Sequence, residues 1–128
     1  MKHLKRFYEN VNDELDIEYI KHCFADLSDD PKCDVEYETH EDYQRDYPGY
    51  YVEEYVSLNI DVPKLSKVGE SIKFEKMIEN SERVVFVVKS IDVAIKRLKD
   101  EYPSYDIKID YEEYEDRPNN YLNINITK

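Results

Sequence analysis

Apolar residues along this chain follow two different spacings, and each spacing returns twice. The first stripe repeats every fourth residue and comprises Leu15, Tyr19, Cys23 and Leu27. It predicts a helix over residues 13–27 that begins after the N-cap Asn12 and ends at the Ser-Asp-Asp-Pro segment 28–31. The second stripe steps by four and three and comprises Val84, Val88, Ile91, Ile95, Leu98 and Tyr102. It predicts a helix over residues 81–102 that ends before Pro103.

Four further segments alternate apolar and polar residues, which is the period of a β-strand. They are 34–38, 51–62, 106–112 and 121–127. Each has a single apolar face, so we expect one side of the sheet to be covered and the other to meet solvent. Polar residues 40–50, with the turn pair Pro48-Gly49, predict a loop after the first strand. Residues 117–120 predict a hairpin turn between the last two strands.

The order helix-strand-strand therefore occurs twice, over residues 12–62 and 81–127. The connection 63–80 is compatible either with a short helix or with an irregular packed segment. At 128 residues the chain fits one domain, spanning 1–128. We predict an α+β two-layer sandwich, in which two helices cover one face of a four-stranded, mostly antiparallel sheet. The open face of that sheet is expected to carry acids, tyrosines and asparagines.

Composition adds a strong and uneven negative charge to this picture. The net charge is -12, and 38% of the residues are charged. Residues 1–64 hold 17 acids and 7 bases, whereas residues 65–128 hold 13 acids and 11 bases. Such a surface repels nucleic acids and anionic membranes. We therefore expect a basic protein partner, and a recognition surface in the first half of the chain.

The sequence lacks the signatures of most enzyme classes. With Gly49 and Gly69 as its glycines, it contains neither a glycine-rich phosphate loop nor a dinucleotide-binding fingerprint. It also lacks a nucleophile elbow and a paired Cys-x-x-Cys motif. We therefore predict a non-enzymatic protein with no catalytic residue and no cofactor. Two cysteines make no disulfide framework, and no segment reads as a signal peptide or a membrane span, so we expect a cytoplasmic protein.

Two kinds of side-chain cluster invite a metal-binding interpretation. A zinc set would need the side chains of His22, Cys23, Cys33 and His40 to converge. Cys23, however, falls on the apolar stripe of the first helix, where a free cysteine usually packs as a small apolar residue. Carboxylate clusters at 26–30, 41–42 and 112–116 could bind calcium or supply an acid–base pair. A solvated acidic surface is the commoner role of such clusters, and we predict no metal site.

The densest candidate site combines tyrosines and carboxylates over residues 36–55. Tyrosine offers a large rigid area with a polar tip, which suits protein interfaces. The alternative is that some of these rings pack beneath their own loop. The predicted partner-binding residues are Glu36, Glu38, Glu41, Asp42, Tyr43, Asp46, Tyr47, Tyr50, Tyr51, Glu53 and Tyr55. We expect charge reversal of Glu53 and Glu54 to weaken binding, and charge reversal of Glu82 and Asp92 in the second helix to leave it unchanged.

Evenly spaced carboxylates favour one function in particular. Residues on one face of a strand repeat every ~6.7 Å, so acids within 34–38 and 106–112 form regular rows of negative charge, as phosphates do. We therefore predict a nucleic-acid mimic that inhibits a basic nucleic-acid-handling protein. The alternatives are an immunity protein that neutralises a basic nuclease toxin, a virion or assembly component, and, as a distant third, a carboxylate-dependent hydrolase.

The opening residues 1–10, Met-Lys-His-Leu-Lys-Arg-Phe-Tyr-Glu-Asn, resemble the starts of small uncharacterised acidic proteins of large tailed bacteriophages. The resemblance covers this segment alone and carries over no functional residue. It implies a phage-encoded inhibitor of a host defence or polymerase protein, acting in the host cytoplasm.

Overall fold

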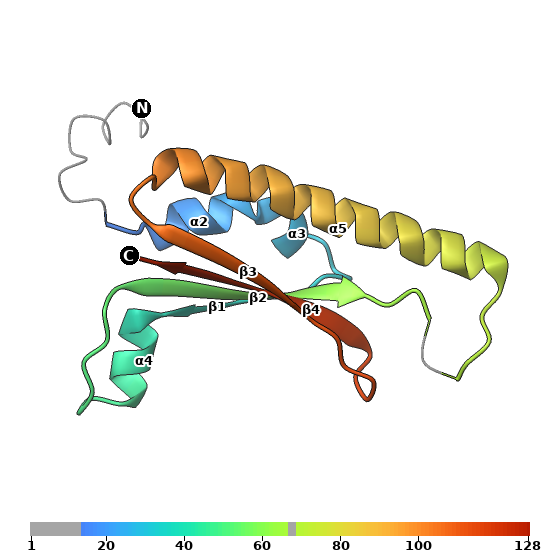
Figure 1. The fold of residues 1–128 in the computed structure, drawn as a ribbon, viewed down its shortest axis with the longest axis horizontal. Coiled ribbons are helices and arrows are strands. Elements are labelled where there is room, and N and C mark those ends of the chain that lie inside the picture. Colours follow the sequence, from blue (N-terminus) through green and yellow to red (C-terminus); the bar gives the residue numbers. More distant parts are fainter. Residues whose placement is uncertain (1–13, 67–68) are drawn as a thin grey trace.

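The computed structural model describes residues 14–66 and 69–128. Two short helices precede a strand, a third short helix and a second strand, and a long helix then leads into a two-stranded hairpin (Figure 1). The elements are α2 (Ile17–Cys23), α3 (Ala25–Ser28), β1 (Val35–Thr39), α4 (His40–Asp46), β2 (Tyr55–Pro63), α5 (Phe74–Glu101), β3 (Asp106–Glu112) and β4 (Asn119–Thr127).

The four strands form one antiparallel sheet in the order β1-β2-β4-β3. The second strand of each predicted repeat lies in the centre, where Leu58 pairs with Ile124 and Ile60 with Leu122. The first strands of the repeats, β1 and β3, form the two edges. This arrangement confirms the predicted α+β class and its four-stranded antiparallel sheet.

The core lies between this sheet and a layer of helices. Figure 1 shows α2, α3 and α5 on the same side of the sheet. The sheet contributes the buried side chains Val56, Leu58, Ile60, Val62, Ile124 and Ile126. The long helix contributes Val87, Ile91, Ala94, Ile95 and Leu98. Removing each large aliphatic side chain from water stabilises the fold by roughly 1.5–3 kcal/mol, which makes this layer the main source of stability.

The first predicted helix is interrupted at Phe24, so that two short helices replace one continuous helix. Around the interruption, N–H groups bond to carbonyl groups three residues back, which is tighter than an α-helical turn. Helix α2 begins at Ile17, where the carboxylate of Asp16 accepts hydrogen bonds from the N–H groups of the first turn. The predicted cap, Asn12, lies outside the described residues.

The long helix α5 begins at Phe74 and not at the predicted Ser81. Ser81 is no cap, because its hydroxyl donates to the carbonyl of Met77 one turn earlier in the helix, at 2.9 Å. The 28 residues of α5 span ~42 Å, whereas the nine residues of β2 span ~30 Å. The first turns of α5 therefore extend past the sheet (Figure 1), and along this fully described helix no residue before Val87 is buried. The predicted end before Pro103 is confirmed.

Three predicted boundaries are wrong. Residues 40–46 form helix α4 in place of a loop. Strand β2 begins at Tyr55, so residues 51–54 lie outside the sheet. The turn between β3 and β4 covers residues 113–118, so residues 119–120 belong to β4 and pair with β2.

Candidate protein-binding surface

The predicted site residues come together at one end of the sheet, on β1, α4, the connection 47–54 and the start of β2. Figure 1 shows α4 on the opposite side of the sheet from α5. We call this region the acidic tyrosine surface. It comprises Glu36, Glu38, Glu41, Asp42, Tyr43, Asp46, Tyr47, Tyr50, Tyr51, Glu53 and Tyr55.

Helix α4 forms because Thr39 and Asp42 make a capping box. The Asp42 carboxylate accepts hydrogen bonds from the Thr39 N–H and the Thr39 hydroxyl, both at 3.0 Å. The Thr39 hydroxyl in turn accepts from the Asp42 N–H at 3.2 Å. These bonds to Thr39, together with the nearby Arg45, hold the pKa of Asp42 below its usual value. The Asp42 carboxylate therefore stabilises the start of α4, and it is less available for contact with a partner than its position in the sequence suggests.

Several tyrosines of the acidic tyrosine surface are anchored within it. The rings of Tyr43 and Tyr47 lie 4.8 Å apart between centroids, which holds the end of α4 against the connection that follows. The Tyr55 hydroxyl donates to the Glu38 carboxylate across β1 and β2. Burial and this carboxylate raise the pKa of Tyr55 above its usual value, so its hydroxyl remains a donor. The Tyr43–Tyr47 ring contact and the Tyr55–Glu38 hydrogen bond therefore hold these parts of the surface in place.

Tyr50 and Tyr51 are the most exposed aromatic residues of the connection between α4 and β2. The side chains of Tyr50 and Tyr51 are 68% and 83% exposed. Glu53 of the same connection and Glu41 in the first turn of α4 are also exposed. A ring that neither packs nor anchors its own fold is available for contact with another molecule.

Most acids on the open side of the sheet lie on its two edges, and Asp61 lies on the same face of the central strand β2. Glu36 and Glu38 lie on β1, whereas Asp110 and Glu112 lie on β3. Between them, the central strands present an uncharged row made of Ser57, Asn59, Asn123 and Asn125. The two edges are three strand spacings apart, about 14 Å. Asparagines are expected on the open face from the sequence, but their place between the two acidic edges follows from the order of the strands.

Glu54 has an internal role. Its carboxylate accepts hydrogen bonds from the Leu15 N–H at 3.1 Å and from the Tyr105 hydroxyl. These bonds join the start of β2 to the segment before α2 and to the loop before β3. A substitution of Glu54 would therefore change the stability of the fold. Glu53 beside it is exposed, so a substitution there can test binding without removing these hydrogen bonds.

The two cysteines are buried and form no disulfide. Burial raises the pKa of Cys33 to about 11, so this thiol remains protonated at neutral pH and is a poor metal ligand. Its Sγ lies 3.8 Å from the main-chain oxygen of Asp61, to which it donates. Across residues 14–66 and 69–128, His, Cys, Asp and Glu side chains nowhere gather in a group of three that could hold a metal ion.

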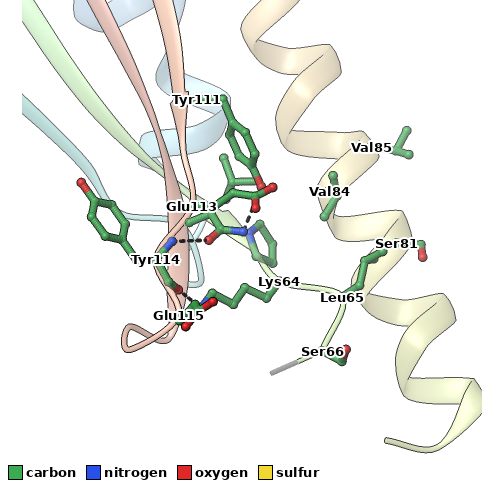
Figure 2. Close-up of a pocket in the computed structure, with 13 residues that line it drawn as sticks. Lys64, Leu65, Ser66, Ser81, Val84, Val85, Tyr111, Glu113, Tyr114 and Glu115 are labelled. Carbon is green, nitrogen blue, oxygen red and sulfur yellow. Dashed lines mark hydrogen bonds between the residues drawn. The ribbon is translucent and has the colours of Figure 1, made fainter. Parts of the chain in front are cut away.

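A cavity at the other end of the molecule carries no signature in the sequence. Its volume is about 600 Å³, and it lies between α5, the segment after β2 and the turn between β3 and β4 (Figure 2). Lys64 donates through Nζ to the main-chain oxygen of Tyr114. Asn120 accepts from the Tyr114 N–H at 3.1 Å and donates to the Tyr111 hydroxyl at 2.9 Å. These bonds fix one wall of the cavity, and Val84 and other residues of α5 form the wall opposite.

Within the described part of the chain, no helix combines the length and the apolar character needed to cross a bilayer. Comparisons with protein families, with curated proteins and with solved structures find no match for this chain. The resemblance of residues 1–10 to phage proteins stays a prediction, and these residues lie outside the described part of the chain. Function must therefore be inferred from the chemistry of the surface.

Proposed function

We propose that this protein is a non-enzymatic binding protein whose acidic tyrosine surface docks into the basic groove of a nucleic-acid-handling protein. The observation that carries the proposal is the exposure of Tyr50 and Tyr51 in the connection that also exposes Glu53 and follows helix α4, where Glu41 is exposed. Aromatic residues are enriched in protein interfaces, and an exposed apolar patch rimmed by polar groups commonly marks a contact site. A net charge of -12 complements a basic partner.

Mimicry of nucleic acid is supported by the spacing of the charges. Glu36 and Glu38 share one face of β1, so their carboxylates repeat at ~6.7 Å. A groove that contacts phosphates would meet evenly spaced negative charge, and exposed tyrosine rings could occupy positions where such proteins stack bases. The uncharged row between the two acidic edges carries hydrogen-bonding groups of the kind that base edges present, although the Asn123 and Asn125 amides also donate within the sheet, to the Leu58 carbonyl and to Asn123 Oδ1.

The proposal implies action in the cytoplasm, where a basic nucleic-acid enzyme of the host would be the target if the chain is encoded by a phage. An immunity protein against a basic nuclease toxin would use the same surface chemistry. The identity of the partner distinguishes the two functions. A virion or assembly component would bind structural proteins in place of a basic enzyme.

The direct test is affinity purification with the intact chain from its native host at low and at high salt, followed by mass spectrometry. We expect a basic nucleic-acid enzyme that is retained at low salt, released at high salt and displaced by added DNA. Capture of a nuclease toxin that DNA does not displace would replace mimicry by the immunity function. Absence of any basic partner would refute both.

A further inference from the structure

The N-terminal half of α5 carries a second apolar stripe, on a different side of the helix from the buried residues. Its members recur at steps of four and three and are Phe74, Ile78, Ser81, Val85 and Val88. Alternating steps of four and three are the heptad spacing of a helix that pairs lengthwise with another helix. We call these residues the α5 seam.

The fold leaves most of the α5 seam exposed, although Ser81 and Val85 also border the cavity beside the β3–β4 turn. The side chains of Ile78, Val85 and Val88 are 43%, 49% and 47% exposed. Figure 2 shows Val84 on the side of α5 that faces the β3–β4 hairpin, whereas Val85 points away from that hairpin. In the middle of the stripe, the Ser81 hydroxyl donates to a carbonyl of its own helix, so it brings no unsatisfied polar group to an interface.

We propose that the α5 seam joins two copies of this protein as an antiparallel helix pair. With the two-fold axis near position 83, Ile78 faces Val88 of the second copy and Ser81 faces Val85 of the second copy. Each contact occurs twice, because a two-fold interface is self-complementary. The small Ser81 side chain lets the helices approach to an interaxial distance of about 8–10 Å, which is usual for packed helices.

The charges beside the α5 seam favour this arrangement. Glu75 of each copy faces Lys89 of the other, which gives two attractive pairs, whereas Glu82 meets its own copy near the axis. Two attractive pairs thus stand against one repulsive pair. In a parallel pair, Glu75 and Lys89 would be ~21 Å apart along the helices and could not meet. The charge pattern therefore selects a second copy in antiparallel orientation over an unrelated helix.

The position of the α5 seam also limits repulsion between two acidic chains. It belongs to residues 65–128, which hold 13 acids and 11 bases. Figure 1 shows α4, and with it the acidic tyrosine surface, at the opposite end of the molecule from the start of α5. A pair of copies formed through the seam would leave that surface free. Because one short helix pair buries less than a standard interface, we expect a dimer that dissociates on dilution.

Sedimentation equilibrium of the full chain, over a range of concentrations in about 0.05 M and about 0.5 M salt, tests the proposal. We expect a monomer–dimer equilibrium that tightens with salt, because screening weakens the repulsion between two negative chains. The variant Ile78→Glu/Val85→Glu should be monomeric. Phe86→Glu/Val93→Glu is the charge-matched control, since Phe86 and Val93 are 40% and 49% exposed on another side of α5, and it should dimerise like the native chain.

A charge exchange tests the orientation without disturbing the apolar residues. Glu75→Lys should weaken the dimer by on the order of tenfold, because it places two like-charged pairs across the interface. The double variant Glu75→Lys/Lys89→Glu should restore the native affinity, because the two charges of each pair are exchanged. Failure of the double variant to restore dimerisation would overturn the antiparallel pairing.

A native chain that stays monomeric at every concentration would overturn the proposal, and so would a dimer that survives Ile78→Glu/Val85→Glu. These outcomes are independent of the proposed function, because the two interactions respond to salt in opposite directions. Salt should strengthen the α5 seam and weaken binding of a basic partner. Loss of either interaction alone therefore identifies which proposal has failed.

Discussion

Glu53 and Glu54 are adjacent in sequence, but only Glu54 is built into the fold. Its two hydrogen-bond donors, the Leu15 N–H and the Tyr105 hydroxyl, lose their acceptor in Glu54→Ala. We expect this change to lower the free energy of unfolding by about 1–3 kcal/mol, and Glu53→Ala to change it by less than about 0.5 kcal/mol. Urea denaturation of both variants measures the difference. Equal stability of the two variants would contradict the internal role of Glu54.

The ionisation of the Asp61 carboxylate opposes folding. Burial, together with the neighbouring Asp34 and Glu36, raises its pKa in the folded protein. Ionised Asp61 therefore destabilises the native state at neutral pH. This penalty disappears as the pH falls below the pKa of an aspartate in the unfolded chain, about 3.9. Asp61→Asn should raise the melting temperature at about pH 7 and lose this advantage at about pH 3.

In Asp30 and Asp42 the pKa is shifted in the opposite direction. The pKa of Asp30 is lowered by its hydrogen bond to Arg83, and that of Asp42 by its bonds to Thr39. Their stabilising effect is present at neutral pH and is lost in acid, in the native chain and in the variant alike. The difference between the two proteins therefore isolates Asp61. An equal gain at both pH values would show that the effect of Asp61→Asn does not arise from charge.

At the scale of elements, α4 depends on its cap. Seven residues with no buried side chain make little helix by themselves, so the Thr39 capping box is a large part of what holds them. Thr39→Ala should destabilise α4 by about 1 kcal/mol and speed amide hydrogen exchange over residues 40–46. Thr127→Ala, at the end of a strand, should leave that exchange unchanged. Unaltered exchange in Thr39→Ala would mean that packing and not capping forms the helix.

The elements that were predicted correctly have strong apolar periods, and those that were missed do not. The period of two in β2 and β4 fixes the covered face of the sheet, and the stripe that ends at Tyr102 fixes the C-terminal half of α5. Helix α4 has a polar sequence and no apolar stripe. Its start could have been found from Thr39 and Asp42, which have capping-box spacing.

The start of α5 could not be predicted from the apolar stripe that packs in the core. Ser81 has the chemistry of a cap, yet residues 74–80 before it form about two further turns of α5. The residues from Phe74 onward carry the heptad spacing of the α5 seam, which has no counterpart in the core. A search for a single buried face could not recognise a helix that extends beyond its own sheet.

At the scale of the whole molecule, much of the candidate site could be predicted because its residues are close together in sequence. Residues 36–55 form one local unit, β1-α4-β2, so composition alone located it. The second acidic edge on β3 and the amide row between the edges depend on strand order. Local patterns do not specify which strands become neighbours, and the cavity beside α5 is invisible in the sequence for the same reason.

The two ends of the molecule have different properties. One end carries the acidic tyrosine surface, and the other carries the α5 seam in the nearly neutral half of the chain. Charged residues of the acidic tyrosine surface should affect the affinity for a basic partner, whereas charged residues of α5 should not. A variant that changes the net charge equally at either end therefore separates the location of the charge from its amount.

The most direct measurement is the dissociation constant for the basic partner recovered by affinity purification, using two charge-matched variants. Glu41→Lys/Glu53→Lys alters exposed residues of the acidic tyrosine surface, and Glu82→Lys/Asp92→Lys alters exposed residues of α5. The account predicts that the first variant weakens binding by on the order of tenfold or more, and that the second stays within about twofold of the native chain. Equal weakening by both variants would contradict it, because net charge and not this surface would then determine binding.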